Sequence, residues 1–207
     1  MTVRIVMFLM IALFQGSIDL EAQWKPKEAR NWQKEMNVSF RSETESPLKE
    51  IDRMKFKRLP FFKINKKLAL LVKWERCNDS SWFEMITTTQ RRPIYRKYAT
   101  LYSSIGDESF KLTAFQPQSL FQKEGWENYL FIPFGDESNG NQTYGGGRYV
   151  EIRIDPGKEL VLLDFNKSYN PYCAYSKRYS CPKIPVENIL DIEINAGVKY
   201  PANKYHH

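Results

Sequence analysis

Histidine is almost absent from this chain of 207 residues, since His206 and His207 at the C-terminus are the only two. The rest of the chain therefore lacks the commonest general base and the commonest metal ligand. This argues against hydrolases built on a Ser-His-Asp or Cys-His arrangement. We expect neither a metal site nor a cofactor, and no function for the two terminal histidines.

Long hydrophobic runs are also missing beyond the N-terminus, so the sequence predicts no membrane-spanning helix. At the N-terminus, Arg4 precedes an apolar run over residues 5–14, and small residues follow up to Ala22. This pattern is typical of a secretory signal peptide. We expect residues 1–22 to be removed, and the mature chain from Gln23 to be exported to the periplasm or outside the cell.

The charge is basic, at +7, but the Lys and Arg residues form no dense cluster. Only short pairs occur, such as Lys66-Lys67 and Arg91-Arg92. Scattered basic residues favour a solvated surface over a groove for polyanions. We expect no nucleic-acid partner, and the sequence indicates no oligomeric state.

The hydrophobic pattern predicts one mainly β domain over residues 23–207. Apolar residues from Trp24 to Phe40 are spaced so that most fall on one face of a helix, which predicts a first helix there. Ser46-Pro47 is typical of the start of a second helix, which should end near Phe56. These two short helices form a lead-in over about 24–57. The β core is expected over about 68–197.

Alternation of apolar and polar residues marks the strands of this core. It is cleanest in residues 148–154 and 189–195, and Gly106-Asp107 is typical of a hairpin loop. Residues 159–165 form a nearly continuous apolar run, which predicts a central strand. We expect an antiparallel β-sandwich or partly closed barrel, with the helices packed on its outside.

Arg148 is the most telling polar residue, because it shares the inward phase of Val150 and Ile152. A buried guanidinium requires a carboxylate or an anionic ligand. Asp164, at the end of the following strand, is the natural partner. Three glycines precede Arg148 and could expose backbone amides to an anion, although a tight strand start explains the glycines alone more simply.

Cys173 and Cys181 are separated by seven residues, a spacing that fits a short disulfide loop and no zinc pattern. In an exported protein a structural disulfide is favoured over a reactive thiol pair. Cys77 is then left as a free thiol.

With these segments in view, the chain resembles a bacterial family known only as a domain of unknown function, number 1684. The resemblance extends from about Trp32 to Lys199. It is carried mainly by YLFIPFGDESNGNQTYGGGRYVEI and LDFNKSYNPYCAYSKRYSCPKIPVENILDIEINAG. Residues of the family pattern present here are Asp136, Thr143, Tyr144, Gly146, Gly147, Arg148, Asp164, Asn166, Asn170, Pro171, Cys173, Cys181, Pro182, Glu187, Asn188 and Gly197. The resemblance implies an exported protein without an established activity.

Three functions remain open. The first is a binding module for a small polar or anionic ligand, held at the ends of two strands. Its candidate residues are Tyr144, Gly146, Gly147, Arg148, Asp164, Asn166, Asn170 and Asn188. The second is a structural or interaction protein of the cell envelope, in which Arg148 and Asp164 form a closed pair. The third is a histidine-free hydrolase with Asp164 or Glu187 as general base and Arg148 as the electrophilic clamp.

Overall fold

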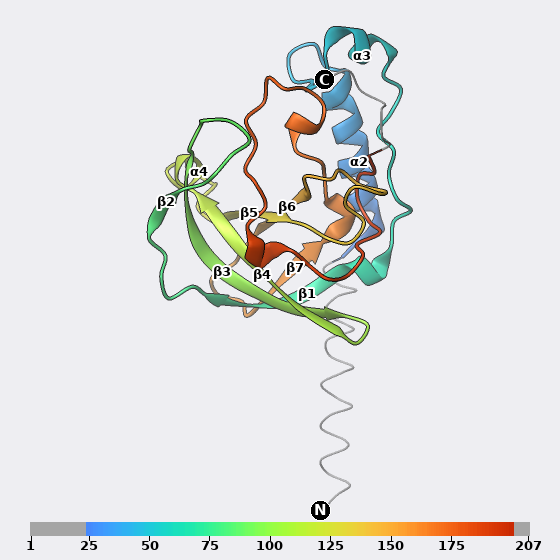
Figure 1. The fold of residues 1–207 in the computed structure, drawn as a ribbon. Coiled ribbons are helices and arrows are strands. Elements are labelled where there is room, and N and C mark those ends of the chain that lie inside the picture. The colour runs from blue at the N-terminus through green and yellow to red at the C-terminus, as the bar shows by residue number, and fades with distance from the viewer. Residues whose placement is uncertain (1–23, 201–207) are drawn as a thin grey trace, which may run out of the picture.

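The computed structural model describes residues 24–200, so the predicted signal peptide and the two terminal histidines lie outside the described residues. The chain forms a curled antiparallel sheet, a half-barrel, with a long helix packed against it (Figure 1). The strand order is β6-β5-β4-β3-β1-β7, and the short β2 pairs with β3. The predicted mainly β, partly closed architecture is confirmed. Among residues 24–200, no helix has the length and hydrophobicity needed to cross a membrane.

The strands follow the apolar runs seen in the sequence. Their bounds are β1 Ala69–Arg76, β2 Trp82–Glu84, β3 Ile94–Ile105, β4 Glu108–Pro117, β5 Tyr129–Phe134, β6 Arg148–Arg153 and β7 Leu160–Asp164. The β3–β4 pairing continues to Ile105 opposite Glu108, so Gly106-Asp107 is the hairpin loop that the sequence predicts.

Two strand predictions are wrong. The β7 strand lies at one end of the sheet path, not in its middle, because only β1 pairs with it. Residues 189–195 alternate in burial but form no strand. Leu190 and Ile192 bond the backbone of residues 135 and 137 over a short distance only. Beyond them, side chains use the backbone: Ile194 donates its N–H to Asp136 and accepts from Arg148 through its carbonyl.

The helices are α2 Pro26–Arg41, α3 Glu50–Lys55 and α4 Gln118–Phe121, with 3-10 turns at Lys66–Leu68, Phe165–Lys167, Tyr172–Ala174 and Val186–Asn188. Proline begins α2, where its missing N–H has no helical partner to lose. The second helix starts at Glu50, later than predicted. Ser46 does not cap it, because the Ser46 hydroxyl donates to the carbonyl of Phe40 and accepts from the N–H of Leu48.

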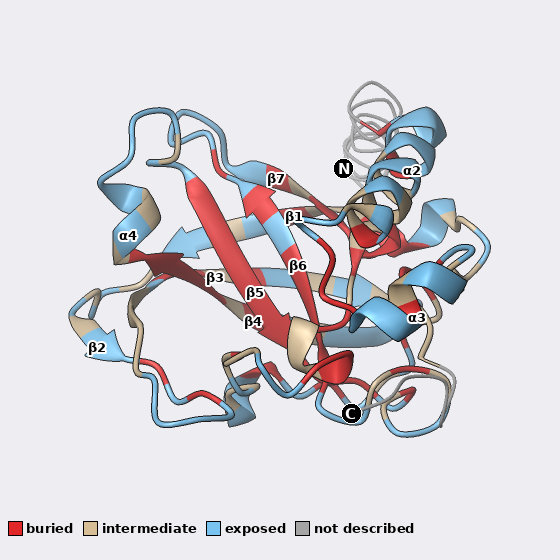
Figure 2. Ribbon diagram, turned by 90° about the horizontal axis from the view of Figure 1, so that it is seen from above, coloured by how far each residue is buried: buried red, intermediate tan, exposed pale blue. Residues whose placement is uncertain are grey.

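The main core fills the inside of the curled sheet, and β5 contributes to it with alternate residues such as Leu130 and Ile132. Every residue of β5 is buried, as Figure 2 shows by its continuous red colour. Both faces of this strand are therefore covered. The face away from the core carries Tyr129 and Phe131, which join a second, aromatic cluster.

Candidate functional site

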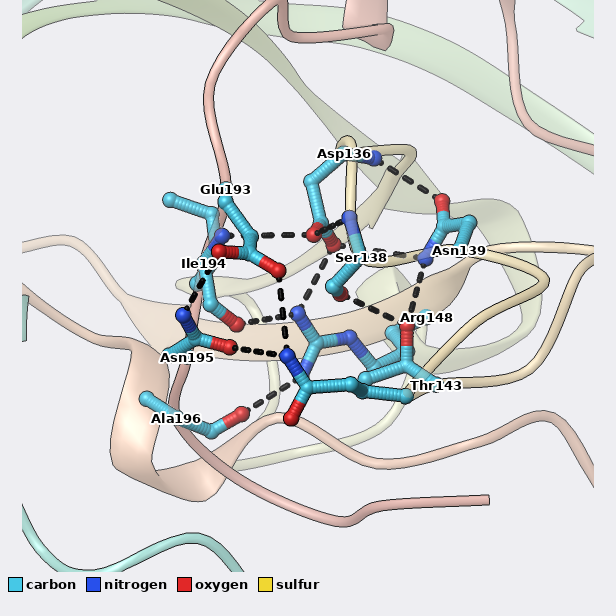
Figure 3. Close-up of polar contacts among 10 residues, drawn as sticks. Asp136, Ser138, Asn139, Thr143, Arg148, Glu193, Ile194, Asn195 and Ala196 are labelled. Carbon is cyan, nitrogen blue, oxygen red and sulfur yellow. Dashed lines mark hydrogen bonds and ion pairs between the residues drawn. The ribbon is translucent and has the colours of Figure 1, made fainter. Parts of the chain in front are cut away.

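Arg148 is fully buried, as its phase in the sequence predicts. Its partner, however, is Asp136: the Nη2 atom lies 2.7 Å from the Asp136 Oδ2 atom (Figure 3). The guanidinium also donates to the carbonyls of Ile194 and Ala196. Burial lowers the pKa of Arg148, and the charge of Asp136 opposes that shift. The predicted pairing with Asp164 is wrong.

Asp136 is held in place by the turn that follows β5. Its Oδ1 atom accepts the N–H of Ser138 at 2.9 Å and the N–H of Ile194 at 3.2 Å. Asn139 and Thr143 continue the network within the same turn (Figure 3). Arg148 and Asp136 thus bond one another and the backbone, while the buried Nε atom of Arg148 has no hydrogen-bond partner among the described residues. This is the buried ion pair of the structural hypothesis, with Asp136 in place of Asp164.

Asp164 has other partners. Its Oδ2 atom accepts the indole N–H of Trp24 at 3.0 Å, and its Oδ1 atom accepts the backbone N–H and the side-chain amide of Asn166. Glu187 pairs elsewhere, with Lys97 at 2.7 Å. The two carboxylates of the hydrolase hypothesis therefore lie in separate interactions with separate partners, and the structure gives that hypothesis no paired acid and base.

The three predicted ligand-binding asparagines are buried and hold loops together. Asn166 bonds both backbone groups of Asn65, and Asn188 bonds the backbone of Thr113 and Pro133. The amide nitrogen of Asn170 donates to Tyr175 and Lys199. These bonds hold the loops in place, and of the three side chains only Asn170 keeps a buried oxygen, Oδ1, without a partner among the described residues.

Three of the predicted residues do reach a cavity. Tyr144, Gly146 and Gly147 line a pocket of about 480 Å³, together with Cys173. We name it the glycine pocket. Its shape depends on Gly147, whose φ of +82° and whose close approach to Ile184 and the Phe134 carbonyl leave no space for a Cβ atom.

A second cavity, of about 420 Å³, was not predicted and lies on the face of the sheet opposite the core. Its floor is formed by outward-facing residues of three strands. They are Tyr95 of β3, Tyr129 and Phe131 of β5, and Tyr149 and Glu151 of β6. Phe131 and Glu151 are direct cross-strand partners, so period-two alternation places them on one face. We name this cavity the aromatic pocket.

Its walls come from two segments far away in the sequence. Trp32 and Met36 of α2 form one side, and the loop with Tyr169, Tyr172 and residues 179–182 forms the other. Figure 1 shows α2 against the orange segment after β7, and the rings of Trp32 and Tyr169 lie 6.4 Å apart. Six of the chain's twelve tyrosines thus surround one cavity.

Among the residues that the structure describes, Glu151 is the one charged residue that lines the aromatic pocket. Its carboxylate accepts a hydrogen bond from the Tyr169 hydroxyl, and no Lys or Arg of the described residues forms a salt bridge with it. Burial, followed by the charge of Glu151, raises the pKa values of Tyr129 and Tyr169. Both tyrosines therefore stay neutral at physiological pH, and the Glu151 carboxylate, which is exposed to solvent, lies against neutral rings.

The two cysteines lie between the pockets, with Cys173 in the wall of the glycine pocket and Cys181 in the wall of the aromatic pocket. Both are free thiols in the structure, and the backbone N–H of Cys173 donates to the Cys181 sulfur at 3.2 Å. The disulfide expected from their spacing therefore stays a prediction. Cys77 is also free, as the sequence predicts.

The sequence contained part of the signal for the aromatic pocket. Alternation placed Glu151 on the face away from the core, and tyrosines recur through residues 169–179. The cover over that face could not be predicted, because it depends on how α2 and this loop pack on the sheet.

The fold and its cavities define a small β-rich half-barrel with an aromatic pocket on its outer face. The chain belongs to the family described as protein of unknown function (DUF1684), whose model matches residues 54–199. It is also similar to the solution structure of an uncharacterised protein from gene locus rrnAC0354 of Haloarcula marismortui. The two share 28% identity with a TM-score of 0.67, over 91% of this chain and 98% of that one. No curated protein matches the sequence.

Proposed function

We propose that this protein is a binding module whose ligand is a small organic cation seated in the aromatic pocket. The observation that carries the proposal is a lone carboxylate, Glu151, in a cavity lined by eight aromatic side chains. The proposal keeps the small-ligand function expected from the sequence, and it changes the site and the sign of the ligand's charge. The binding site expected around Arg148 is not proposed again, since that guanidinium is buried and paired.

The composition of the wall supports a cation. Aromatic rings present a negative face, and a cation within about 6 Å of a ring centre gains roughly 0.5–2 kcal/mol, more when water is excluded. Glu151 adds a carboxylate that attracts a cation, and because its side chain is exposed to solvent this attraction is partly screened by water and salt. An ammonium with methyl groups would satisfy both the rings and the carboxylate. The volume of about 420 Å³ is in the range of pockets for small molecules.

Three basic groups lie near the aromatic pocket without lining it. Arg91 donates to the carbonyl of Ser180 at 2.7 Å. Arg153, two residues after Glu151 on β6, donates to the carbonyl of Gly125, and its guanidinium lies over the Trp126 ring. Arg153 and Lys167 line an adjoining cavity that shares Glu151 with the aromatic pocket. Among the described residues, Glu151 is thus the charged residue that lines the aromatic pocket itself, with two cations on its other side.

Thermal unfolding with choline as the probe tests this proposal. We expect choline to raise the melting temperature of the wild-type protein. We expect the Glu151→Gln variant to lose most of that rise, because it keeps the size of the side chain and removes its charge. Glu108→Gln is the matched control, since Glu108 is exposed at the β3–β4 hairpin and does not line the pocket. Equal shifts in all three proteins, or no shift in any, would overturn the proposal.

We also propose that the protein acts outside the cytoplasm after removal of residues 1–22. The support is the charged, apolar and small-residue pattern of that segment. Mass spectrometry of the protein purified from its native host tests it. The proposal expects a chain that begins at Gln23, and an intact N-terminus in the cytoplasmic fraction would contradict it.

A further inference from the structure

We propose that Cys173 and Cys181 form a reactive thiol pair, in which Cys173 attacks low-molecular-weight disulfides that enter the glycine pocket. Cys181 then acts as the resolving thiol. This activity is separate from ligand binding in the aromatic pocket and goes beyond the proposed function. It also differs from a structural disulfide, which would stay oxidised and take no part in exchange.

The two thiols differ in exposure, as attacking and resolving thiols must. Cys173 is half-buried and lines the glycine pocket, whereas Cys181 is buried in the aromatic cluster. The contact between the Cys173 N–H and the Cys181 sulfur, at 3.2 Å, places the second sulfur against the backbone of the first cysteine. A molecule in the glycine pocket therefore meets Cys173 first.

Cys181 is held rigidly by the segment before β3. Its carbonyl accepts the N–H of Thr88 at 2.9 Å, and its own N–H donates to the Thr88 hydroxyl at 3.1 Å. The N–H of Lys183 donates to the carbonyl of Ile86, so the backbone pairing between residues 86–88 and 181–183 continues past Cys181. Cys173 lies instead on a 3-10 turn of three residues, Tyr172–Ala174. One thiol is thus fixed and the other lies on a short turn.

Hydroxyl groups around Cys173 stabilise its thiolate. Hydrogen bonding by Cys181 above all, and by Thr88 and Tyr144, lowers the pKa of the Cys173 thiol to about 7, although burial opposes the shift; the same contact and burial raise the pKa of the Cys181 thiol, so Cys173 is the thiol of the pair that ionises first. Burial above all, and also the neighbouring Cys173, raise the pKa of Tyr144 to about 12, so this hydroxyl remains a donor near neutral pH. Nucleophilic cysteines depend on such donors, because the thiolate is the attacking species.

The glycine that precedes Gly147 explains how Tyr144 reaches this position. A Cβ atom on Gly146 would lie 2.5 Å from the Tyr144 ring. The missing side chain therefore lets the Tyr144 ring lie close over the backbone of Gly146, in the wall that it shares with Cys173. The glycine at position 146 is therefore explained by the position of the Tyr144 ring, and no anion bound to the backbone is needed to explain it.

The exchange balances with a disulfide RSSR as the oxidant. The Cys173 thiolate attacks one sulfur, the S–S bond breaks, and RS⁻ leaves with the electron pair. Cys181 then loses its proton and attacks the Cys173 sulfur, which releases the second RS⁻. The protein dithiol is oxidised to a disulfide, and RSSR is reduced to two RSH that carry the two protons.

Oxidised glutathione tests the proposal in the full chain with Cys77→Ser as the background, so that only Cys173 and Cys181 can react. In this background we expect Cys181→Ser to accumulate one glutathione on Cys173 by intact mass, and Cys173→Ser to gain none on Cys181 while folded. The parent with both thiols should lose two hydrogens without retaining an adduct, and reduced dithiothreitol should restore both thiols. A disulfide that is already present and resists reduction would show a structural staple and overturn the proposal.

The rate of alkylation by iodoacetamide supplies a second measurement. We expect Cys173 to react about tenfold faster than Cys77 at pH 7, with a half-maximal rate near its pKa of about 7. Cys77 is the control within the same molecule, since it is also only partly exposed. Tyr144→Phe keeps every thiol and should slow Cys173 alone. Equal rates for the two thiols in the folded protein would overturn the proposal, even if a cysteine variant failed to fold.

Discussion

Arg148 and Asp136 form a buried ion pair, 2.7 Å apart, between the first residue of β6 and the turn after β5. Both side chains are fully shielded from water. Removing one partner leaves an uncompensated charge in the interior, which costs about 3–5 kcal/mol. We predict that Asp136→Ala lowers the free energy of unfolding by that amount, as measured by urea denaturation.

The exposed pair of Lys73 and Glu75 is the control for this prediction. Because both side chains are solvated, Glu75→Gln should leave the unfolding midpoint almost unchanged. A small effect of Asp136→Ala, similar to that of Glu75→Gln, would contradict the buried ion pair and reopen Arg148 to a ligand.

Gly147 has a positive φ and no room for a side chain. A Cβ atom there would lie 2.4 Å from Ile184 and 2.8 Å from the carbonyl of Phe134. We predict that Gly147→Ala destabilises the fold by more than about 1 kcal/mol. Gly106→Ala is the control, because Gly106 has a φ of +61° with nothing near its absent Cβ. If both variants lose equal stability, the backbone conformation alone matters and the contact with Ile184 does not.

Trp24 ties the start of the described chain to Asp164 through a hydrogen bond of 3.0 Å. We predict that Trp24→Phe costs about 1–3 kcal/mol, since it keeps most of the ring and leaves a buried carboxylate oxygen without its donor. Trp74→Phe, which removes a more exposed bond to the carbonyl of Lys158, should cost less. Chemical denaturation measures both, and the reverse order would contradict the structural role assigned to Asp164.

Alkaline pH should destabilise the protein through its buried tyrosines. Burial raises the pKa of Tyr149 above its usual value of 10.0. The unfolded chain releases this proton first, so the contribution to stability is complete below pH 10 and falls as the pH rises further. We predict that Tyr149→Phe makes the loss of unfolding free energy above pH 10 less steep. An unchanged slope would show that Tyr149 ionises as readily in the folded protein as in the unfolded one.

The sequence correctly predicted those structural features that depend on residues close to one another in the chain. Alternation over residues 148–154 placed Arg148 inside and Glu151 outside, and Gly106-Asp107 marked a hairpin that the structure confirms. These features follow from the two-residue period of a strand and from turn chemistry. They require no knowledge of the rest of the fold.

Partners distant in space could not be derived in this way. Asp164 ends β7 and was a plausible partner for Arg148, but it accepts a hydrogen bond from Trp24, 140 residues away. The alternation in residues 189–195 correctly predicted their burial, while the Arg148 and Asp136 side chains bond the backbone of Ile194, where a strand would have continued. The aromatic pocket exists only because α2 and the loop after β7 pack on one face. Each of these outcomes is decided by tertiary contacts.

The most direct test of the central claim is isothermal titration calorimetry of the wild-type protein with choline and with 3,3-dimethylbutan-1-ol. The alcohol has nearly the same shape as choline and no charge. The proposed cation site predicts that choline binds at least about tenfold more tightly, equivalent to about 1.4 kcal/mol, because only choline interacts with Glu151 and the ring faces as a cation. Equal affinity for the two compounds, or binding of neither, would contradict it.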